Sequence, residues 1–271
     1  MPKQVRHDQI NMITLSNLSN YLTSLFNFDP NLNVAKIDPI MSNGLMVRGK
    51  EEIKKIGFSV SASISLFGKA KKENCDCIIV HHTFNFPPTN RFDAIFQNRY
   101  SFLTQNHISL FGFHFLLDAH PEIGNNARIL KIIGAKPTKP FLHRGDPWGY
   151  MGEFTEPKSM DAIRKDFKEY ESRRTVFYDF GPKEIRKVVG VSGKGSPYAG
   201  DMQQLIDENI DLYITGEVHE WIRELFKEAK INFLAAGHYM TETIGIKSLM
   251  KKISEDFPDT QTQWLDVTND I

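Results

Sequence analysis

Short apolar runs alternate with stretches of helical periodicity along the first half of the chain. Apolar residues between Ile10 and Phe26 recur at helical spacing, which predicts a first helix there. Apolar runs follow at 56–60, 75–80 and 108–113, separated by segments that could be helical. Buried strands that alternate with helices are typical of a mostly parallel sheet with helices on its faces.

The second half of the chain repeats this alternation. Residues 157–172 have the pattern of a helix, with Pro157 tolerated in its first turn. The other predicted elements are strands at 187–191, 211–215 and 231–236, and helices at 198–209, 217–229 and 239–253. The pattern therefore predicts an α/β protein built from two α/β units.

The patterning is weakest between Ala135 and Tyr150, where Pro, Gly and charged residues are frequent. Such a composition is typical of loops, so we place the crossover between the two units close to this segment. No internal repeat of short period is visible, which argues against a solenoid.

The composition bears on the class of partner. Of the 271 residues, 41% are hydrophobic, and the 33 basic side chains are balanced by 33 acidic ones. A protein that binds nucleic acid usually has a basic excess or a basic stripe. The short basic clusters at 69–72 and 173–174 have acidic neighbours and are interpreted as solvated faces. Nucleic acid is therefore not expected as a partner.

Two cysteines, Cys75 and Cys77, flank Asp76 at the start of an apolar run. Residues two apart on a strand share a face, with side chains about 6.6 Å apart, which does not favour a disulfide. The first ten residues contain no apolar signal core, and no apolar run reaches about 18 residues. These features predict reduced core thiols and a soluble, cytoplasmic protein that is not attached to a membrane.

The first group of potential metal ligands is the pair His81 and His82, which directly follows the apolar run at 75–80. Ligands of open α/β sheets gather beyond the carboxyl ends of the strands. A turn at that point could direct the two neighbouring imidazoles at two different metals. The alternative is a pair of surface or hydrogen-bonded histidines, which is the better interpretation of an isolated His-His.

The second group follows the strand predicted at 108–113 and contains His114, Asp118 and His120. If the two strands run parallel, these side chains leave the sheet on the same side as the histidine pair. A carboxylate has two oxygens, so Asp118 could bridge two cations. Its alternative role is to cap the helix expected around 125–132.

The third group is His238 and Glu242, after the strand predicted at 231–236. Residues four apart on a helix share one face, so this spacing can offer an imidazole and a carboxylate to one metal. An ordinary solvated His/Glu pair is the alternative interpretation.

Each group alone is a weak signal, but the three together favour a metal site. Their donors are nitrogen and oxygen, which suit zinc, iron or manganese, and the absence of thiolates argues against a structural zinc site. Two neighbouring cations need an anionic ligand between them. We therefore predict an open site for two divalent metal ions, with ligands His81, His82, Asp118, His238 and Glu242.

Two further segments allow two interpretations each. Gly193 and Gly195 lie between a strand and a helix, where they could admit an anion or form a tight turn. Their spacing is not that of a P-loop or of a dinucleotide-binding motif. In Thr215-Gly216-Glu217 with His219, Thr215 could cap a helix, or the segment could contact a metal ligand or a substrate.

Five blocks of the sequence are Asn43-Gly44-Leu45, Ile79-Val80-His81-His82, His114 with Asp118-Ala119, Thr215-Gly216-Glu217 with His219, and Gly237-His238-Tyr239 with Thr241-Glu242. In this order they resemble the Ngg-interacting-factor-three-like family, whose members are also called GTP cyclohydrolase 1 type 2 homologues. The His-His and Gly-His-Tyr-x-Thr-Glu blocks are specific. This chain has Phe115 and Met46 where the family often has Thr and Gln, which affects the expected substrate contacts more than metal ligation.

The resemblance implies two related α/β domains, residues 1–130 plus 237–271 and residues 131–236, with the first completed by the C-terminal segment. It also implies a toroid, a homohexameric ring whose metal sites face an inner cavity. By position, the family's metal ligands fall on the five residues already proposed. His114 matches a family histidine near the metals that could carry a proton or act as a further ligand.

Two functions follow as hypotheses. The first is a dinuclear metal-dependent hydrolase, in which metal-activated water attacks an unknown small molecule and His114 transfers the proton. The family's label points to GTP ring opening, although the chain has no P-loop to hold a triphosphate. The second is a non-catalytic metal-binding ring that acts as an interaction or regulatory scaffold.

Overall fold

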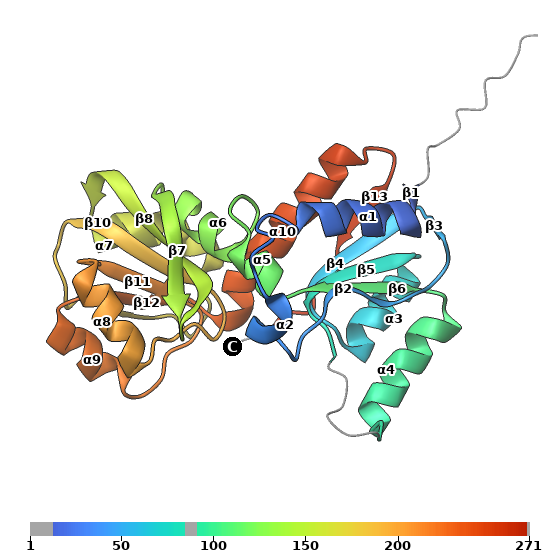
Figure 1. The fold of residues 1–271 in the computed structure, drawn as a ribbon, viewed down its shortest axis with the longest axis horizontal. Coiled ribbons are helices and arrows are strands. Elements are labelled where there is room, and N and C mark those ends of the chain that lie inside the picture. The colour runs from blue at the N-terminus through green and yellow to red at the C-terminus, as the bar shows by residue number, and fades with distance from the viewer. Residues whose placement is uncertain (1–12, 85–90, 270–271) are drawn as a thin grey trace, which may run out of the picture.

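The described part of the chain contains two main sheets. A computed structural model describes residues 13–84 and 91–269. One sheet has five strands and the other has six, and β1 (Ile13–Thr14) pairs with β3 (Glu52–Ile53) in a separate ribbon. The two sheets lie side by side, each with its own helices, and α10 (His238–Asp256) runs between them (Figure 1). The predicted α/β fold class is confirmed.

The first sheet has the strand order β13-β4-β5-β6-β2. Its strands are β2 (Asn43–Val47), β4 (Lys55–Ser61), β5 (Cys77–His82), β6 (Ser109–Phe113) and β13 (Gln261–Trp264). Four of them run parallel, and only the edge strand β2 is antiparallel to its neighbour. Because β13 comes from the end of the chain, the C-terminal segment completes this sheet.

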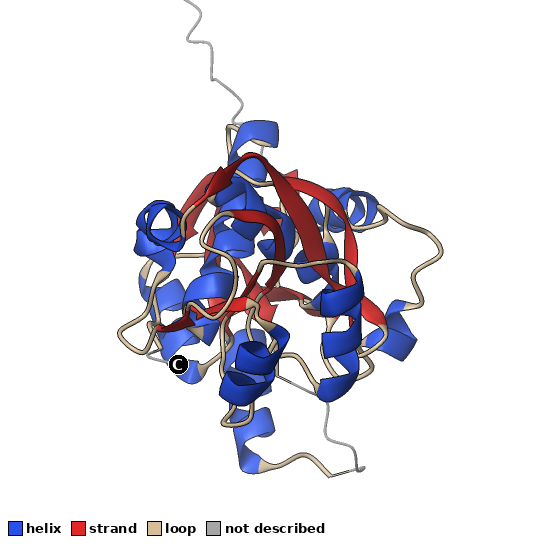
Figure 2. Cartoon of the chain, turned by 90° about the vertical axis from the view of Figure 1, so that its left-hand side faces the viewer, coloured by secondary structure: helices blue, strands red, loops and turns tan. Residues whose placement is uncertain are grey.

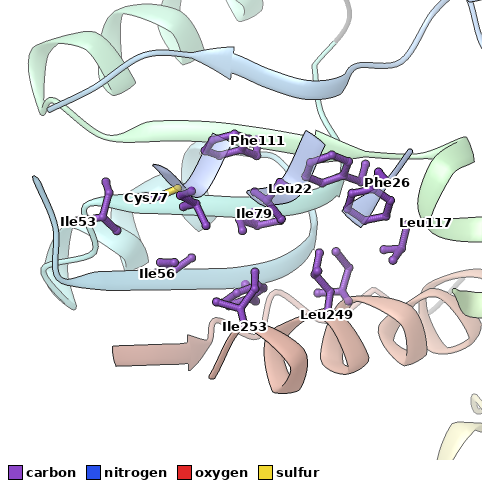
Figure 3. Close-up of a cluster of buried hydrophobic side chains, with 14 of the residues drawn as sticks. Leu22, Phe26, Ile53, Ile56, Cys77, Ile79, Phe111, Leu117, Leu249 and Ile253 are labelled. Atoms are coloured by element: carbon purple, nitrogen blue, oxygen red, sulfur yellow. The ribbon is translucent and has the colours of Figure 1, made fainter. Parts of the chain in front are cut away.

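Helices cover both faces of the first sheet. They are α1 (Leu15–Leu25), α2 (Val34–Ile37), α3 (Ile64–Lys72), α4 (Ala94–Gln105) and α5 (Phe115–Ala119). On one face, Leu22 of α1 and Leu249 of α10 pack in the same cluster as Ile79 of β5 (Figure 3). Its sequence neighbour Ile78 points to the other face, where it packs in the cluster formed with α3 and α4.

The second sheet has the strand order β7-β8-β10-β11-β12-β9, with β10, β11 and β12 parallel in its centre. Its strands are β7 (Lys136–His143), β8 (Asp146–Lys158), β9 (Val176–Tyr178), β10 (Ile185–Val191), β11 (Leu212–Thr215) and β12 (Asn232–Ala235). Its helices are α6 (Asn125–Ile132), α7 (Met160–Phe167), the 3₁₀ turn η1 (Lys168–Tyr170), α8 (Ala199–Asp207) and α9 (Ile222–Ala229). The helices surround the strands in Figure 2.

The weakly patterned segment at 135–150 is not a loop but a β-hairpin formed by β7 and β8. Its prolines are tolerated because β7 is an edge strand of the sheet. Arg144 (φ 55°) and Gly145 (φ 85°) connect β7 to β8 in the left-handed conformation that a two-residue hairpin loop favours. The exact domain boundaries stay a prediction.

Several predicted helices begin later than their patterns indicated. The helix predicted from Pro157 begins at Met160, because β8 continues to Lys158 and the Ser159 hydroxyl accepts the N–H of Ala162 at 3.3 Å. The helix predicted from Glu217 likewise begins only at Ile222. The first helix begins at Leu15, because Ile13–Thr14 form β1 and Thr14 caps the helix, and residues 10–12 of that prediction lie outside the described residues.

Both cysteines are free and buried, as predicted, but they do not share a face. The strand β5 begins at Cys77, so Cys75 lies before it and packs in the cluster on the opposite side of the sheet. Within the described ranges, no helix combines the length and apolar character that a membrane span requires.

One helix connects the two cores. On α10, Ile246 and Leu249 belong to a cluster of the first sheet, whereas Ile244 belongs to a cluster of the second. The helix starts directly after β12 of the second sheet and then packs on β4 of the first. The N-terminal turn of α10 is therefore held where the carboxyl ends of the two sheets come together.

Candidate metal centre

All five predicted ligands come together between the two sheets. His81 and His82 end β5, and Asp118 lies on α5, which follows β6. His238 and Glu242 lie in the first turns of α10, which follows β12 of the other sheet. Three strand ends therefore contribute to one cluster, as the position of each group after a strand predicted.

Glu242 occupies the middle of the cluster. Its Oε1 lies 3.0 Å from Nε2 of His238 and 3.5 Å from Nε2 of His81. Its Oε2 lies 3.3 Å from Nε2 of His82. The carboxylate is buried, and it faces His238 across one turn of α10, as the spacing of four residues predicted.

Asp118 contacts the cluster from α5. Its Oδ2 lies 3.6 Å from Nε2 of His81, and its Oδ1 accepts hydrogen bonds of 2.8 Å from both Asn125 Nδ2 and Ser192 Oγ. It does not cap the following helix α6, whose N-cap is Gly124. One oxygen is thus anchored by neutral donors, while the other is left to face the imidazole.

His114 also joins the cluster, but His120 does not. The His114 ring centroid lies 4.9 Å from that of His81 and 5.3 Å from that of His82. His120 is turned away, and its Nε2 lies 3.3 Å from the carbonyl oxygen of Leu25.

The ligand atoms form two overlapping groups. One contains His81, His82 and His114, and the other contains His82, His238 and Glu242. Within each group the atoms lie no more than 4.8 Å from one another, and His82 belongs to both. Each group could hold one cation, with Asp118 beside the first.

The four imidazoles of the cluster are each engaged at Nδ1 by an oxygen atom. The partners are Phe113 O for His81 (2.8 Å), Ser61 Oγ for His82 (3.0 Å), Asp38 Oδ2 for His114 (2.8 Å) and Glu217 Oε1 for His238 (2.5 Å). A carbonyl or carboxylate oxygen at Nδ1 can only accept, so it places the ring proton there and leaves the Nε2 lone pair for a metal, and the Ser61 hydroxyl is able to accept in the same way. This arrangement is typical of metal-binding histidines.

Asp38 and Ser61 were not found from the sequence, because each is an isolated polar residue far along the chain from the histidine it holds. Asn43, from the sequence block Asn43-Gly44-Leu45, contacts both His114 and Asp38. Its Oδ1 accepts the backbone N–H of His114 at 3.1 Å, and its Nδ2 donates to Asp38 Oδ2 at 3.2 Å. Asn43 and Asp38 together orient the His114 ring.

Two buried potential ligand atoms of the cluster have no hydrogen-bond partner among the described residues. In the described part of the chain, His81 Nε2 and Glu242 Oε2 are buried and have no hydrogen-bond partner. A buried polar atom without a partner costs about 1–3 kcal/mol. Lone pairs of imidazole and carboxylate also repel at these distances unless a cation lies among them. The nitrogen and oxygen donors therefore fit a divalent metal such as zinc, iron or manganese.

The pKa values of Glu242 and His81 are shifted because imidazoles and carboxylates are crowded together in the cluster. Burial favours the neutral form of Glu242, but the imidazoles of His82, His81 and His238 hold the pKa of this carboxyl well below its usual range. Burial likewise works against the charged form of His81, yet the carboxylates of Asp118 and Glu242 raise its pKa to about 9. The cluster thus attracts positive charge, which protons or metal ions can supply.

The glycine loop after β10 is a tight turn that supports the centre. Gly193 has a φ of +57°, and a Cβ at this position would lie 2.1 Å from Glu242 Oε1. Its backbone N–H donates to Thr241 Oγ1 at 3.0 Å. A Cβ on Gly216 would in turn lie 2.6 Å from the carbonyl oxygen of Gly193. Only residues without a side chain allow this loop to approach the carboxylate.

The segment 215–219 holds a metal-ligand candidate rather than capping a helix. Glu217 reaches Nδ1 of His238, whereas Thr215 is buried at the end of β11, seven residues before α9 begins at Ile222. Of the two interpretations left open by the sequence, contact with a ligand residue is the one that the geometry favours.

Fold and site together thus define an α/β protein with a buried cluster of imidazoles and carboxylates between its two sheets. The profile of the family described as Duf34/NIF3 (NGG1p interacting factor 3) matches residues 13–270. The chain belongs to this family, which confirms the resemblance found in the five sequence blocks.

Individual relatives agree with this assignment. A Pyrococcus abyssi protein named GTP cyclohydrolase 1 type 2 homolog is 37% identical over 231 residues, covering 84% of this chain and 91% of the relative. A Yersinia pestis protein of the same name is 34% identical over 242 residues, covering 88% and 94%. The solved structure of protein ybgI, of unknown function, matches with a TM-score of 0.80 and 30% identity, covering 95% of this chain and 100% of the other.

Replacing Glu217 by Gln tests the support of His238. The substitution keeps the shape but weakens the acceptor at Nδ1, so the affinity for zinc should fall about 10- to 100-fold. A competition titration against a chromogenic chelator measures this change. The matched control is Glu220→Gln, an exposed position on the same segment. Equal zinc affinities of Glu217→Gln and the wild type would contradict the assigned role.

Proposed function

We propose that this protein is a dinuclear metal-dependent hydrolase with the ligands His81, His82, Asp118, His238 and Glu242. The observation that carries the proposal is the common orientation of the histidines. Each ring is held at Nδ1 by an oxygen atom, so that its Nε2 is free for the cluster. Anchoring of this kind is not expected of histidines that merely lie on a surface.

Two metal ions are proposed because the ligand atoms form two overlapping groups. Cations a few Å apart repel one another unless an anionic ligand lies between them. Glu242 can serve in this way, because one of its oxygens approaches His82 while the other approaches His81 and His238. Asp118 adds a second carboxylate, whose Oδ2 also faces Nε2 of His81.

The chemistry expected here is the activation of water. Divalent cations held in this site would lower the pKa of water and stabilise negative charge that develops on a substrate. The protein's own contribution to proton transfer is assigned to His114. Its Nδ1 is held by Asp38, so Nε2 can accept and release a proton next to the cluster.

Asp38 is suited to keep His114 in this orientation. Burial alone would raise the pKa of its carboxyl, but the hydrogen bond and charge of His114, together with Asn43 and the backbone of Phe115, lower the pKa overall. A carboxylate that stays ionised favours the ring proton at Nδ1 and stabilises an imidazolium when His114 takes up a second proton.

The substrate is proposed to be a small, nucleotide-like molecule. The name of the curated relatives points to GTP ring opening. A cavity of about 320 Å³ beside the cluster is lined by His82, His114, Asp118 and Glu242, and it is of a size that takes a small ligand.

The alternative is a metal-binding scaffold without turnover, because metal binding alone accounts for every anchored imidazole of the cluster. The homohexameric toroid and the cytoplasmic location expected from the sequence stay predictions under either function. Turnover is what separates the two.

Metal analysis of gently purified protein, followed by a substrate screen on the same preparation, tests the hydrolase. We expect about two divalent metals per chain, and Asp118→Ala should lose at least the metal beside His81. Asp179→Ala, at an exposed position, is the matched control and should retain them. The screen covers nucleotides, phosphoesters and cyclic amides. Metal without turnover would favour the scaffold, and an Asp118→Ala protein that keeps both metals would contradict the ligand set.

The role of His114 is tested by His114→Gln. Metal content should persist, while hydrolysis should fall roughly 10²- to 10⁴-fold, because the proton carrier is lost but the five ligands remain. His107→Gln, an exposed histidine outside the cluster, is the control. If metal content falls together with activity, His114 is a ligand instead. If both persist, proton transfer by His114 is wrong.

A further inference from the structure

The cavity beside the cluster has two chemically different sides. One consists of the candidate metal ligands and His114. The other comes from the second sheet and includes Arg144, Asp146 and Trp148 of the β7–β8 hairpin, together with Lys194 of the glycine loop. Neither metal binding nor proton transfer uses this second side, so its chemistry is free to serve substrate recognition.

Trp148 supplies a fixed aromatic surface in this wall. Its ring packs edge-to-face against Phe115, with centroids 4.9 Å apart, and lies 5.5 Å from the ring of His114. The side chain of Asn126 donates to its backbone carbonyl, which fixes the start of β8. A rigid indole in a cavity wall is a platform on which a planar ring can stack. Such a ring would lie directly beside His114.

Arg144 supplies a positioned cation at the same wall. Its guanidinium lies over the ring of Tyr198, 4.1 Å from the centroid, and donates to the Tyr198 hydroxyl. Its backbone N–H is held by Asp201 Oδ1 at 2.9 Å. The aromatic contact orients the guanidinium without neutralising it. Its hydrogen-bonding fork therefore stays available for an anionic group.

The charge of this side is matched to a small anion. Lys194 adds a second cation, and no ion pair to a carboxylate engages Lys194 or Arg144 within residues 13–84 and 91–269. Asp146 lines the same side and opposes one of the two charges. Two cations opposed by one carboxylate suit a single phosphate group, which carries about two negative charges, better than a triphosphate. The absence of a P-loop spacing in the sequence agrees with this.

We propose that Trp148, Arg144 and Lys194 form a recognition subsite for a planar heteroaromatic ring that carries one phosphate, as in a nucleoside monophosphate. The ring stacks on Trp148, and the phosphate binds Arg144 and Lys194. The subsite rests on the proposed function in one respect: the reacting atoms of the ligand lie beside the metal centre. Binding itself requires no turnover, so the two can be tested separately.

Isothermal titration calorimetry on the zinc-loaded protein tests the subsite with four probes: guanosine 5′-monophosphate, guanosine, ribose 5-phosphate and GTP. The monophosphate should bind at least about 10-fold tighter than guanosine or ribose 5-phosphate, since each of these lacks one of the two contacts. It should also bind more tightly than GTP, whose additional charges find no partner on this wall.

Substitutions at two positions assign the contacts. Trp148→Ala should weaken the monophosphate about 5- to 150-fold, whereas Trp148→Phe should restore much of the affinity by keeping a stacking ring. Arg144→Gln should weaken the monophosphate about 10-fold or more while leaving guanosine unchanged. Arg223→Gln, an exposed arginine outside the cavity, is the matched control. Metal content and circular dichroism show whether each variant is folded.

The outcomes separate the subsite from the hydrolase. Equal affinities for the monophosphate, guanosine and ribose 5-phosphate, or an unchanged affinity of folded Trp148→Ala, would overturn the subsite. Tighter binding of GTP would overturn the choice of one phosphate. If the binding pattern holds but no substrate is turned over, the subsite stands and the hydrolase fails.

Discussion

The carboxylate of Glu242 lies among three imidazole nitrogens at 3.0–3.5 Å in a buried place. Because those rings are engaged at Nδ1, their Nε2 atoms face the carboxylate, and each contact needs a proton or a metal ion between the nitrogen and the oxygen. Donors of like polarity can share such a space only if positive charge lies between them. The need for a cation at this point is the constraint on which the rest of the site depends.

The architecture around the cluster follows from holding these donors in place. Glu242 and His238 lie on a helix whose side chains pack into cores of both sheets. This packing fixes the position of the two ligands relative to both sheets. Gly193 and Gly216 let two loops approach the carboxylate and the start of that helix more closely than any side chain would allow. Rigid elements thus carry the ligands, and the loops pack around them.

Much of this centre could be predicted from local patterns. His238 and Glu242 were recognisable because helical spacing brings them to one face, and the histidine pair because it ends an apolar run. Asp38 and Ser61 could not be found in this way, since only the tertiary fold brings them to their imidazoles. The hairpin that carries Trp148 was hidden by prolines, which an edge strand tolerates but which resemble a linker in the sequence.

Anomalous diffraction from crystals of the zinc-loaded protein tests the central claim most directly, because it locates the cations without relying on activity. We predict two anomalous peaks inside the cluster, one within bonding distance of His82, His238 and Glu242 and the other beside His81 and Asp118. Peaks found only elsewhere on the chain, or a cluster without a peak at saturating zinc, would contradict it.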